Sequence, residues 1–385
     1  MTTEAPADEM HPDIHRGLNG VYFDRSRVCF IDGRAGVLLY RGYSIHELAA
    51  QSTFEETSYL LLHGELPTRK QLDMFEAELR AARTVPEPVL EIVRGIADAH
   101  PMDVLRTAIS ALAAFDPERE DSSPEAITRK GARLTAQSST LVAAHHAIRE
   151  GREPVAPSTS LGHAANFLYM LTSEEPETET ARLMDIDFVL HAEHSSNASS
   201  FAARVVAATG ADLHATIVAG IAALSGPAHG GAAENVMQMA REIGDPNRAA
   251  EYVKAKRNHR QPIMGFGHRV YRTEDPRARH LREGVQYLSA ERGEPTWFAI
   301  LEAVEEAMRP YARLGVAPNV DFYAGVIYHL LGIPQEFFVP IFALGRVPGW
   351  TVQVLEQFEN NILIRPLLDY TGPAERAYIP IEQRE

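Results

Sequence analysis

The chain has 385 residues, a formal net charge of −15 at pH 7, a single cysteine and 45% hydrophobic residues. Its length exceeds one ordinary core, so we expect two domains that share a cleft. The negative charge argues against a nucleic-acid partner, and Cys29 alone can form neither an intrachain disulfide nor a thiolate metal cluster. The N-terminus lacks the pattern of a signal sequence and no run of about 18 apolar residues occurs, so we expect a cytoplasmic protein that does not enter a membrane.

The first half of the chain reads as a polar arm, a short hairpin and then helices. Residues 1–16 are polar and carry early prolines. Two short β-type segments surround glycine-rich turns between residues 28 and 42, and they make the one convincing hairpin. From residue 44 to residue 150 the apolar residues recur at helical spacing between proline and glycine breakers, with a polar loop at 116–124. This part predicts a helical scaffold.

The second half is also helical. An apolar face leads to His191 and His194, and we expect both histidines on one side of a helix that ends near 195–197. Alanine-rich helices are predicted at 201–208 and 213–224, and further helices start at 232 and cover 277–290 and 297–309. Segments 324–331, 337–342 and 350–358 complete the pattern, and the tail from Pro366 is irregular. The fold class is therefore all-α with a short N-terminal β-hairpin.

One stretch, GFGHRVYRTEDPRA at 265–278, combines several chemical groups. Glycines flank Phe266, His268 can move a proton near neutral pH, and Arg277 offers a planar fork for a carboxylate. A dinucleotide-binding loop is disfavoured because the third glycine is missing and the preceding segment is too polar for a buried strand. Taken alone, the stretch could equally be a surface turn with solvated arginines.

Four further segments place His, Asp or Arg next to glycine, proline or polar turn residues. They are HAEHSSNAS at 191–199, GPAHGG at 226–231, PNVDFY at 318–323, and GRVPGW at 345–350 with IRP at 364–366. Together with the first stretch, these motifs resemble the citrate synthase family, and the resemblance spans roughly residues 17–372. It implies a mostly helical homodimer that condenses oxaloacetate with acetyl-CoA to give citrate and CoA. We place the large domain at 1–227 and 327–385 and the small domain at 228–326, between two breakers.

The resemblance implies three catalytic residues. Asp321 would be the base that removes a proton from the acyl methyl group, and His229 would hydrogen-bond the thioester oxygen. A neutral His229 suits that task, and the helix start after it should depress its protonation. His268 would donate to the oxaloacetate carbonyl. The implied substrate-binding residues are His194, Arg277, Arg346 and Arg365, the last reaching the site of the partner subunit.

Coenzyme A brings phosphates and an adenine to the implied site. Arg272 and Lys256 are the predicted charge partners, and the backbone of Ile263, Met264 and Gly265 is the predicted adenine edge. We expect no cofactor besides the substrates. We also expect no metal, because the two histidines at 191 and 194 lack the metalloprotease spacing and a third nearby ligand.

Several alternatives stay open at this point. The sequence departs from the family pattern at four places: residues 195–196, Ala228, Ala233 and Gln353. The small residues beside His229 would leave room for propionyl-CoA as substrate, with 2-methylcitrate as the product. Locally, Asp321 could simply cap a helix. A non-catalytic protein that binds CoA or a dicarboxylate is the alternative from another class, although the retained histidines and Asp321 argue against it. A lyase running in reverse is disfavoured, since the chain has no Walker loop.

Overall fold

The computed structural model describes residues 13–18 and 20–384. The chain divides into two compact units. We call Ser26–Ile362 the body, and the described residues 13–18, 20–25 and 363–384 the terminal unit.

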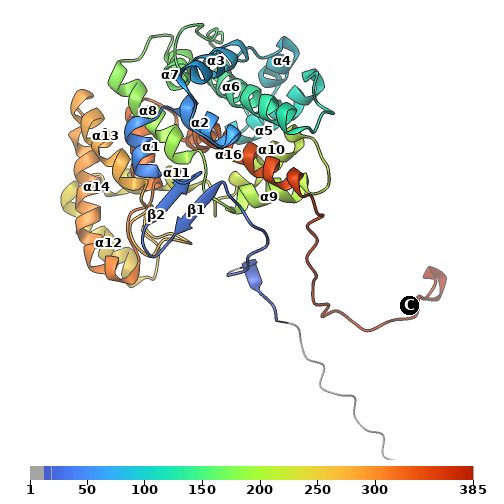
Figure 1. The fold of residues 1–385 in the computed structure, drawn as a ribbon. Helices are drawn as coiled ribbons and strands as arrows, with labels where there is room; N and C mark the ends of the chain where they lie inside the picture. The colour runs from blue at the N-terminus through green and yellow to red at the C-terminus, as the bar shows by residue number, and fades with distance from the viewer. Residues whose placement is uncertain (1–12, 19, 385) are drawn as a thin grey trace, which may run out of the picture. The chain divides into compact units, whose positions relative to one another are not determined.

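The body begins with a small antiparallel sheet of order β1-β2-β3, shown in blue in Figure 1. Strands β1 (Cys29–Asp32) and β2 (Val37–Tyr40) pair in the register Cys29 opposite Tyr40, which confirms the predicted hairpin. The structure adds a third strand, β3 (Tyr43–Ser44), that sequence patterns did not indicate because it has only two residues.

Sixteen α-helices lie in the described residues, which confirms the all-α class. The first six match the alternation of helices and breakers predicted for residues 44–150, whereas α7 was not predicted. Most of these seven helices begin at a side-chain cap such as Thr68, which forms a reciprocal capping box. They are α1 (Ile45–Gln51), α2 (Phe54–His63), α3 (Arg69–Ala81), α4 (Glu87–Gly95), α5 (Pro101–Leu112), α6 (Pro124–Arg149) and α7 (His163–Thr172).

The remaining helices carry or flank the predicted site residues. They are α8 (Thr178–His191), α9 (Ala198–Ala207), α10 (Leu213–Leu224), α11 (Ala232–Ile243), α12 (Ala249–Asn258), α13 (Ala278–Glu291), α14 (Pro295–Met308), α15 (Asp321–Leu330) and α16 (Phe338–Glu359). Helix α12 was not predicted, because its polar sequence leaves only Ala249 and Val253 buried. In Figure 1, α12, α13 and α14 lie together on one side of the body, and α14 packs against both of the others.

Helix α16 is the central element of the body's core and packs against α6, α8, α9 and α10. The sequence predicted two segments separated by Pro348, but the structure has one continuous helix of 22 residues that contains this proline. Burial explains the difference, since packing around residues such as Trp350 outweighs the hydrogen bond that proline cannot make. Gly220 of α10 permits the close approach, because a Cβ there would lie 2.9 Å from the Trp350 ring.

The segment Gln335–Glu359 consists of α16 and the 3₁₀ turn before it. Among the described residues, it is the one segment that is long and apolar enough to cross a membrane. Some 89% of its apolar window is buried inside the body. It is therefore a core helix.

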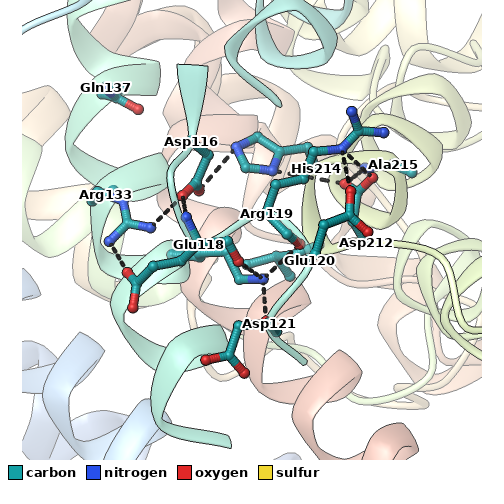
Figure 2. Close-up of polar contacts among 12 residues, drawn as sticks. Asp116, Glu118, Arg119, Glu120, Asp121, Arg133, Gln137, Asp212, His214 and Ala215 are labelled. Carbon is teal, nitrogen blue, oxygen red and sulfur yellow. Dashed lines mark hydrogen bonds and ion pairs between the residues drawn. The ribbon is translucent and has the colours of Figure 1, made fainter. Parts of the chain in front are cut away.

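A partly buried polar cluster fixes the predicted polar loop at 116–124 (Figure 2). Arg133 pairs with Asp116 at 2.8 Å and with Glu118 at 2.7 Å, and His214 of α10 lies 3.5 Å from Asp116. Lys130, only 1% exposed, donates to three backbone carbonyl oxygens of this loop at 2.5–3.2 Å. The cluster joins the loop to α6 and α10.

The terminal unit has little regular structure besides the 3₁₀ turns Arg16–Leu18 and Ile381–Gln383. Many of its apolar side chains are exposed, for example Leu367 at 85% and Leu368 at 96%. The irregular tail after Pro366 agrees with the sequence prediction. The predicted loose arm at 1–16 lies largely outside the described residues. The subdivision into domains at 228–326 remains a prediction.

Candidate active site

Two loops of the body are joined through their backbones and bring distant motifs together. Asn319 donates from its backbone N–H to the carbonyl of Gly265 at 2.9 Å, and its side chain donates to the carbonyl of Gly267 at 3.0 Å. His268 follows Gly267 directly, and Asp321 lies two residues after Asn319. These bonds therefore place the two motifs side by side.

Gly265 is required where it stands. Its φ of +77° lies in the left-handed region, and an added Cβ would come within 2.7–2.8 Å of Phe322. No other residue type would allow α15 to begin this close to the loop.

An aromatic cluster forms around His194, His268 and Tyr271. The ring centres are 5.2 Å apart for the two histidines and 4.7 Å apart for His268 and Tyr271, and the Tyr271 hydroxyl lies 3.2 Å from His194 Nε2. Helix α8 ends at His191, earlier than predicted, so His194 lies in the loop after the helix. Burial lowers the pKa of His194 well below its usual range, and Arg277 lowers it further.

His268 has a defined donor and acceptor arrangement. Its Nδ1 accepts hydrogen bonds from the backbone N–H groups of Val270 at 3.0 Å and Tyr271 at 3.3 Å. Burial and the charge of Arg277 lower the pKa of His268 to about 4, so the ring is neutral at pH 7. Because Nδ1 accepts, the hydrogen of the neutral ring is on Nε2, which is left to donate to a ligand.

His229 is held in the opposite way. The Nε2 of His229 accepts a hydrogen bond from the backbone N–H of Ser199 at 3.3 Å and lies 2.9 Å from the Ser199 hydroxyl oxygen. This hydroxyl oxygen accepts a hydrogen bond from Trp350 Nε1 at 3.1 Å. The neutral ring therefore carries its hydrogen on Nδ1. Burial, with a smaller effect of Arg346, lowers the pKa of His229 to about 4. Neutrality was predicted from the helix start that follows His229, but burial is its main cause.

Asp321 is the first residue of α15, and the N-cap is Val320, so Asp321 does not cap the helix. This result contradicts the local alternative that its carboxylate serves only as a cap. Burial raises the pKa of Asp321 above its usual value, while His191 and Arg277 act in the opposite direction. A carboxylate with a raised pKa is a stronger base than an exposed one.

Two buried arginines flank the histidines. Arg277 is 4% exposed and makes a bidentate pair with Asp275, with N–O distances of 2.9 and 2.7 Å. Arg346 is 1% exposed, donates from Nε to the carbonyl of His191 at 2.5 Å and lies 4.9 Å from the centre of the Phe342 ring. Its Nη1 is buried and has no hydrogen-bond partner among the described residues. Such a group is available to a carboxylate ligand.

The residues predicted to contact CoA differ in their surroundings. Arg272 is exposed, and its backbone N–H donates to the carbonyl of Gly33 in the hairpin turn at 2.7 Å. Lys256 lies on α12, 3.9 Å from Glu242. Ile263 is buried, whereas Met264 is half-buried. The structure thus presents Arg272 to solvent and engages Lys256 in a loose ion pair.

The structure brings together most of the predicted groups within the body. They are His194, His229, His268, Arg277, Asp321 and Arg346, which are joined by the contacts and mutual pKa effects given above. Arg365 belongs to the terminal unit, where its side chain is exposed.

Sequence reasoning did not assign Ser199, Tyr271 or Asp275. All three stand inside or beside the motifs quoted above, but only the fold shows that they hold His229, His194 and Arg277 respectively.

Two cavities of about 220 and 380 Å³ lie elsewhere in the body and share Leu62, His63, Pro124 and Thr128 in their linings. None of the predicted site residues lines either cavity. The candidate site is therefore defined by its residues and not by these cavities.

Comparison with known proteins gives consistent matches along the chain. The family model described as "Citrate synthase, C-terminal domain" matches residues 17–367. A citrate synthase of Deinococcus radiodurans is 46% identical over 97% of this chain and 100% of its own length. The 2-methylcitrate synthase 2 of Corynebacterium glutamicum is 41% identical over 97% and 98% respectively. A Thermoplasma acidophilum citrate synthase, solved as a ternary complex with carboxymethyl coenzyme A and oxaloacetate, superposes with a TM-score of 0.91 at 30% identity, covering 97% of this chain and 100% of that one.

Proposed function

The chain belongs to the citrate synthase family of acyltransferases, and from this premise we propose that it condenses oxaloacetate with acetyl-CoA and water to citrate and CoA. The observation that carries the proposal is a pair of neutral histidines with opposite tautomers together with a half-buried carboxylate, Asp321, whose loop is hydrogen-bonded to the loop of His268. The reaction needs one donor for each of two carbonyl groups and one base.

Oxaloacetate binds between two arginines, Arg277 and Arg346, and two histidines, His194 and His268. Its carboxylates pair with Arg277 and Arg346, and Arg346 Nη1 gains the partner that it lacks. His268 donates from Nε2 to the ketone, and His194 orients the substrate. Asp275 keeps the Arg277 fork fixed before the substrate arrives, which reduces the entropy lost on binding.

The thioester is activated at His229 and Asp321. His229 donates from Nδ1 to the thioester oxygen, because Nε2 is already bonded to Ser199. Asp321 removes a proton from the acyl methyl group, and the resulting enol or enolate attacks the ketone carbon that His268 polarises. Water then hydrolyses the condensed thioester to release CoA.

The proposal also covers the residues that bind CoA, the assembly of the chain and the closure of its domains. Arg272 and Lys256 contact the phosphates, and the backbone at Ile263–Gly265 contacts the adenine. The chain acts as a cytoplasmic homodimer in which Arg365 reaches the oxaloacetate of the partner subunit. Oxaloacetate closes a small domain at 228–326 over a large domain and completes the CoA site. The Thermoplasma relative was solved with oxaloacetate and a CoA analogue bound, which supports a common site for both.

The acyl preference is the finer part of the proposal. The ring centre of Phe342 lies 6.5 Å from that of His229, and a bulky ring this close to the histidine that binds the thioester supports acetyl-CoA over propionyl-CoA. One extra methylene changes binding by about 1–3 kcal/mol, or roughly 10–200-fold in kcat/KM.

Release of free thiol from acetyl-CoA or propionyl-CoA in the presence of oxaloacetate tests both the condensing activity and the acyl preference. No release from either thioester would refute a condensing enzyme. A higher kcat/KM for propionyl-CoA would instead assign a 2-methylcitrate synthase.

A further inference from the structure

The turn of the N-terminal hairpin contacts the loop that carries His268. The carbonyl oxygen of Gly33 accepts a hydrogen bond from the backbone N–H of Arg272 at 2.7 Å. At the same residue, a Cβ built on Gly33 would lie 2.3 Å from the carbonyl oxygen of Val270 and 2.8 Å from its carbonyl carbon. Atoms in proteins do not approach a Cβ this closely, so the two backbones meet where only a glycine leaves room.

Backbone strain does not explain the glycine at position 33. Its φ lies outside the left-handed region in which glycine is favoured, so an alanine could adopt the same φ. The position therefore depends on the close approach of the loop. Gly33→Ala would change that contact without straining the φ of the turn itself.

The part of the loop that Gly33 contacts is also the part that holds His268. The backbone N–H groups of Val270 and Tyr271 donate to His268 Nδ1 at 3.0 and 3.3 Å. Val270 thus meets Gly33 with its carbonyl group and His268 with its N–H group. A short backbone turn, residues 270–272, connects the hairpin to the nitrogen whose hydrogen bonds fix the tautomer of His268.

A second loop of the body anchors the two ends of this segment. Gly267 donates from its backbone N–H to the carbonyl of Ala317 at 2.8 Å, and Asp275 donates from its N–H to the carbonyl of Pro318 at 3.1 Å. The backbone of 270–272, between these anchors, makes one hydrogen bond to another segment of the described chain, and it is the bond to Gly33. The position of the turn therefore depends on the hairpin.

The hairpin turn is itself held by a side chain. Asp32 Oδ1 accepts hydrogen bonds from the backbone N–H groups of Arg34 at 2.8 Å and Ala35 at 3.0 Å. An aspartate that bonds the backbone two residues further on shapes a tight turn. Because Gly33 lies between Asp32 and these two N–H groups, the carboxylate keeps the peptide group of Gly33 in place.

We propose that Asp32 and Gly33 are positioning residues for the condensing reaction: the hairpin turn holds residues 270–272 so that His268 directs its Nε2–H at the oxaloacetate ketone. This role depends on that of His268 in the proposed function. Neither residue acts on the substrate itself. Both act through the backbone turn whose N–H groups hold His268 Nδ1.

Gly33→Ala places a methyl group against the Val270 carbonyl and forces the hairpin and the turn apart. We expect kcat to fall about tenfold or more, because displacement of a catalytic group by about 1 Å can cost about 10²-fold in rate. The KM for acetyl-CoA should change by less than about threefold, since the long side chain of Arg272 can follow a small shift of its backbone. Initial rates of thiol release measure both quantities.

The ring nitrogens of His268 give a readout that a general loss of stability would not move. In protein labelled with ¹⁵N in its histidine rings, NMR distinguishes a nitrogen that carries hydrogen from one with a lone pair, and the signals are assigned by their absence in His268→Asn. Wild type should carry the hydrogen on Nε2 and titrate with a pKa of about 4. In Gly33→Ala, Nδ1 loses bonds that favour the neutral ring, so both tautomers should appear and the pKa should rise towards its ordinary value of 6.5.

The titratable and charged groups around His268 are unchanged in this variant. They are His194 and Tyr271, whose rings contact the histidine, and Asp275 and Arg277, whose charges act on its pKa. A rise in the pKa that accompanies a change of tautomer therefore reports the loss of the backbone N–H groups.

Three further variants of the N-terminal sheet serve as a matched set. Asp32→Ala removes the acceptor that shapes the turn and should change kcat and the His268 signals in the same direction as Gly33→Ala, whereas Asp32→Asn keeps an acceptor oxygen and should stay within about twofold of wild type in kcat. Gly42→Ala strains the turn between β2 and β3, where φ is +92° and an added Cβ meets no atom within 4 Å. It should lower the unfolding temperature and leave kcat and the His268 signals unchanged.

The outcomes separate this inference from the proposed function. Wild type that releases no thiol refutes the condensing reaction, while the His268 signals still test the contact with the hairpin turn. Unchanged His268 signals in Gly33→Ala and Asp32→Ala would overturn the inference, and so would equal changes in Gly42→Ala. Altered signals with an unchanged kcat would overturn the catalytic use of the turn. Circular dichroism verifies that each variant is folded, and the two Asp32 variants carry the test if Gly33→Ala does not fold.

Discussion

Asp321→Asn should lower activity and raise stability at the same time. Asparagine matches the carboxylate in size, and the oxaloacetate contacts of Arg277 and Arg346 are untouched. Loss of a general base costs about 10²–10⁴ in kcat, or roughly 2.7–5.5 kcal/mol at 1.36 kcal/mol per factor of ten. Calorimetric affinity for oxaloacetate should stay nearly unchanged.

The stability gain follows from the raised pKa of Asp321. Because burial raises this pKa above its ordinary value of 3.8, the folded state holds the proton more tightly than the unfolded state. Ionised Asp321 therefore destabilises the fold at pH values above its folded pKa, and the penalty disappears below the unfolded value. The asparagine variant should unfold at a higher temperature than wild type at pH 8, and the difference should shrink towards pH 4.

Thiol release and thermal unfolding at the two pH values check these expectations. Asp73→Asn, at an exposed position on α3, is the matched control and should change neither quantity. Near-normal turnover of Asp321→Asn would refute the base assignment. A lower unfolding temperature at pH 8 would refute the argument from burial.

Three further predictions concern charge. Arg272→Ala should raise the KM for acetyl-CoA more than that for oxaloacetate and weaken its salt dependence, as measured by initial rates at two ionic strengths. Lys130→Met should lower the free energy of unfolding by about 2–4 kcal/mol because three loop carbonyls lose a charged donor, whereas exposed Lys70→Met should change it little in urea titrations. Coexpressed Asp321→Asn and Arg365→Ala chains should regain activity at about a quarter of their sites if the site is shared across a two-fold interface, and silent heterodimers would contradict that arrangement.

The chemistry of this protein could be predicted from the sequence because it depends on residue types in short motifs. Gly265 to Arg277 supply a left-handed turn, an imidazole and a guanidinium within a few positions, and the resemblance of five such motifs to one family predicted both the fold class and the condensing reaction. The hairpin and most helices followed from local periodicity, since they depend on near neighbours in the chain.

Tertiary structure decided everything that depends on burial or on distant partners. Pro348 lies inside a continuous helix because packing around it outweighs its local preference, and Lys130 is buried because loop carbonyls surround it. The neutral state of His229 comes mainly from burial, and its tautomer comes from Ser199, thirty residues away in sequence. The contact of the Tyr328 hydroxyl with Asp187 appears only once α8 and α15 are packed, because no sequence spacing specifies which faces of separate helices meet.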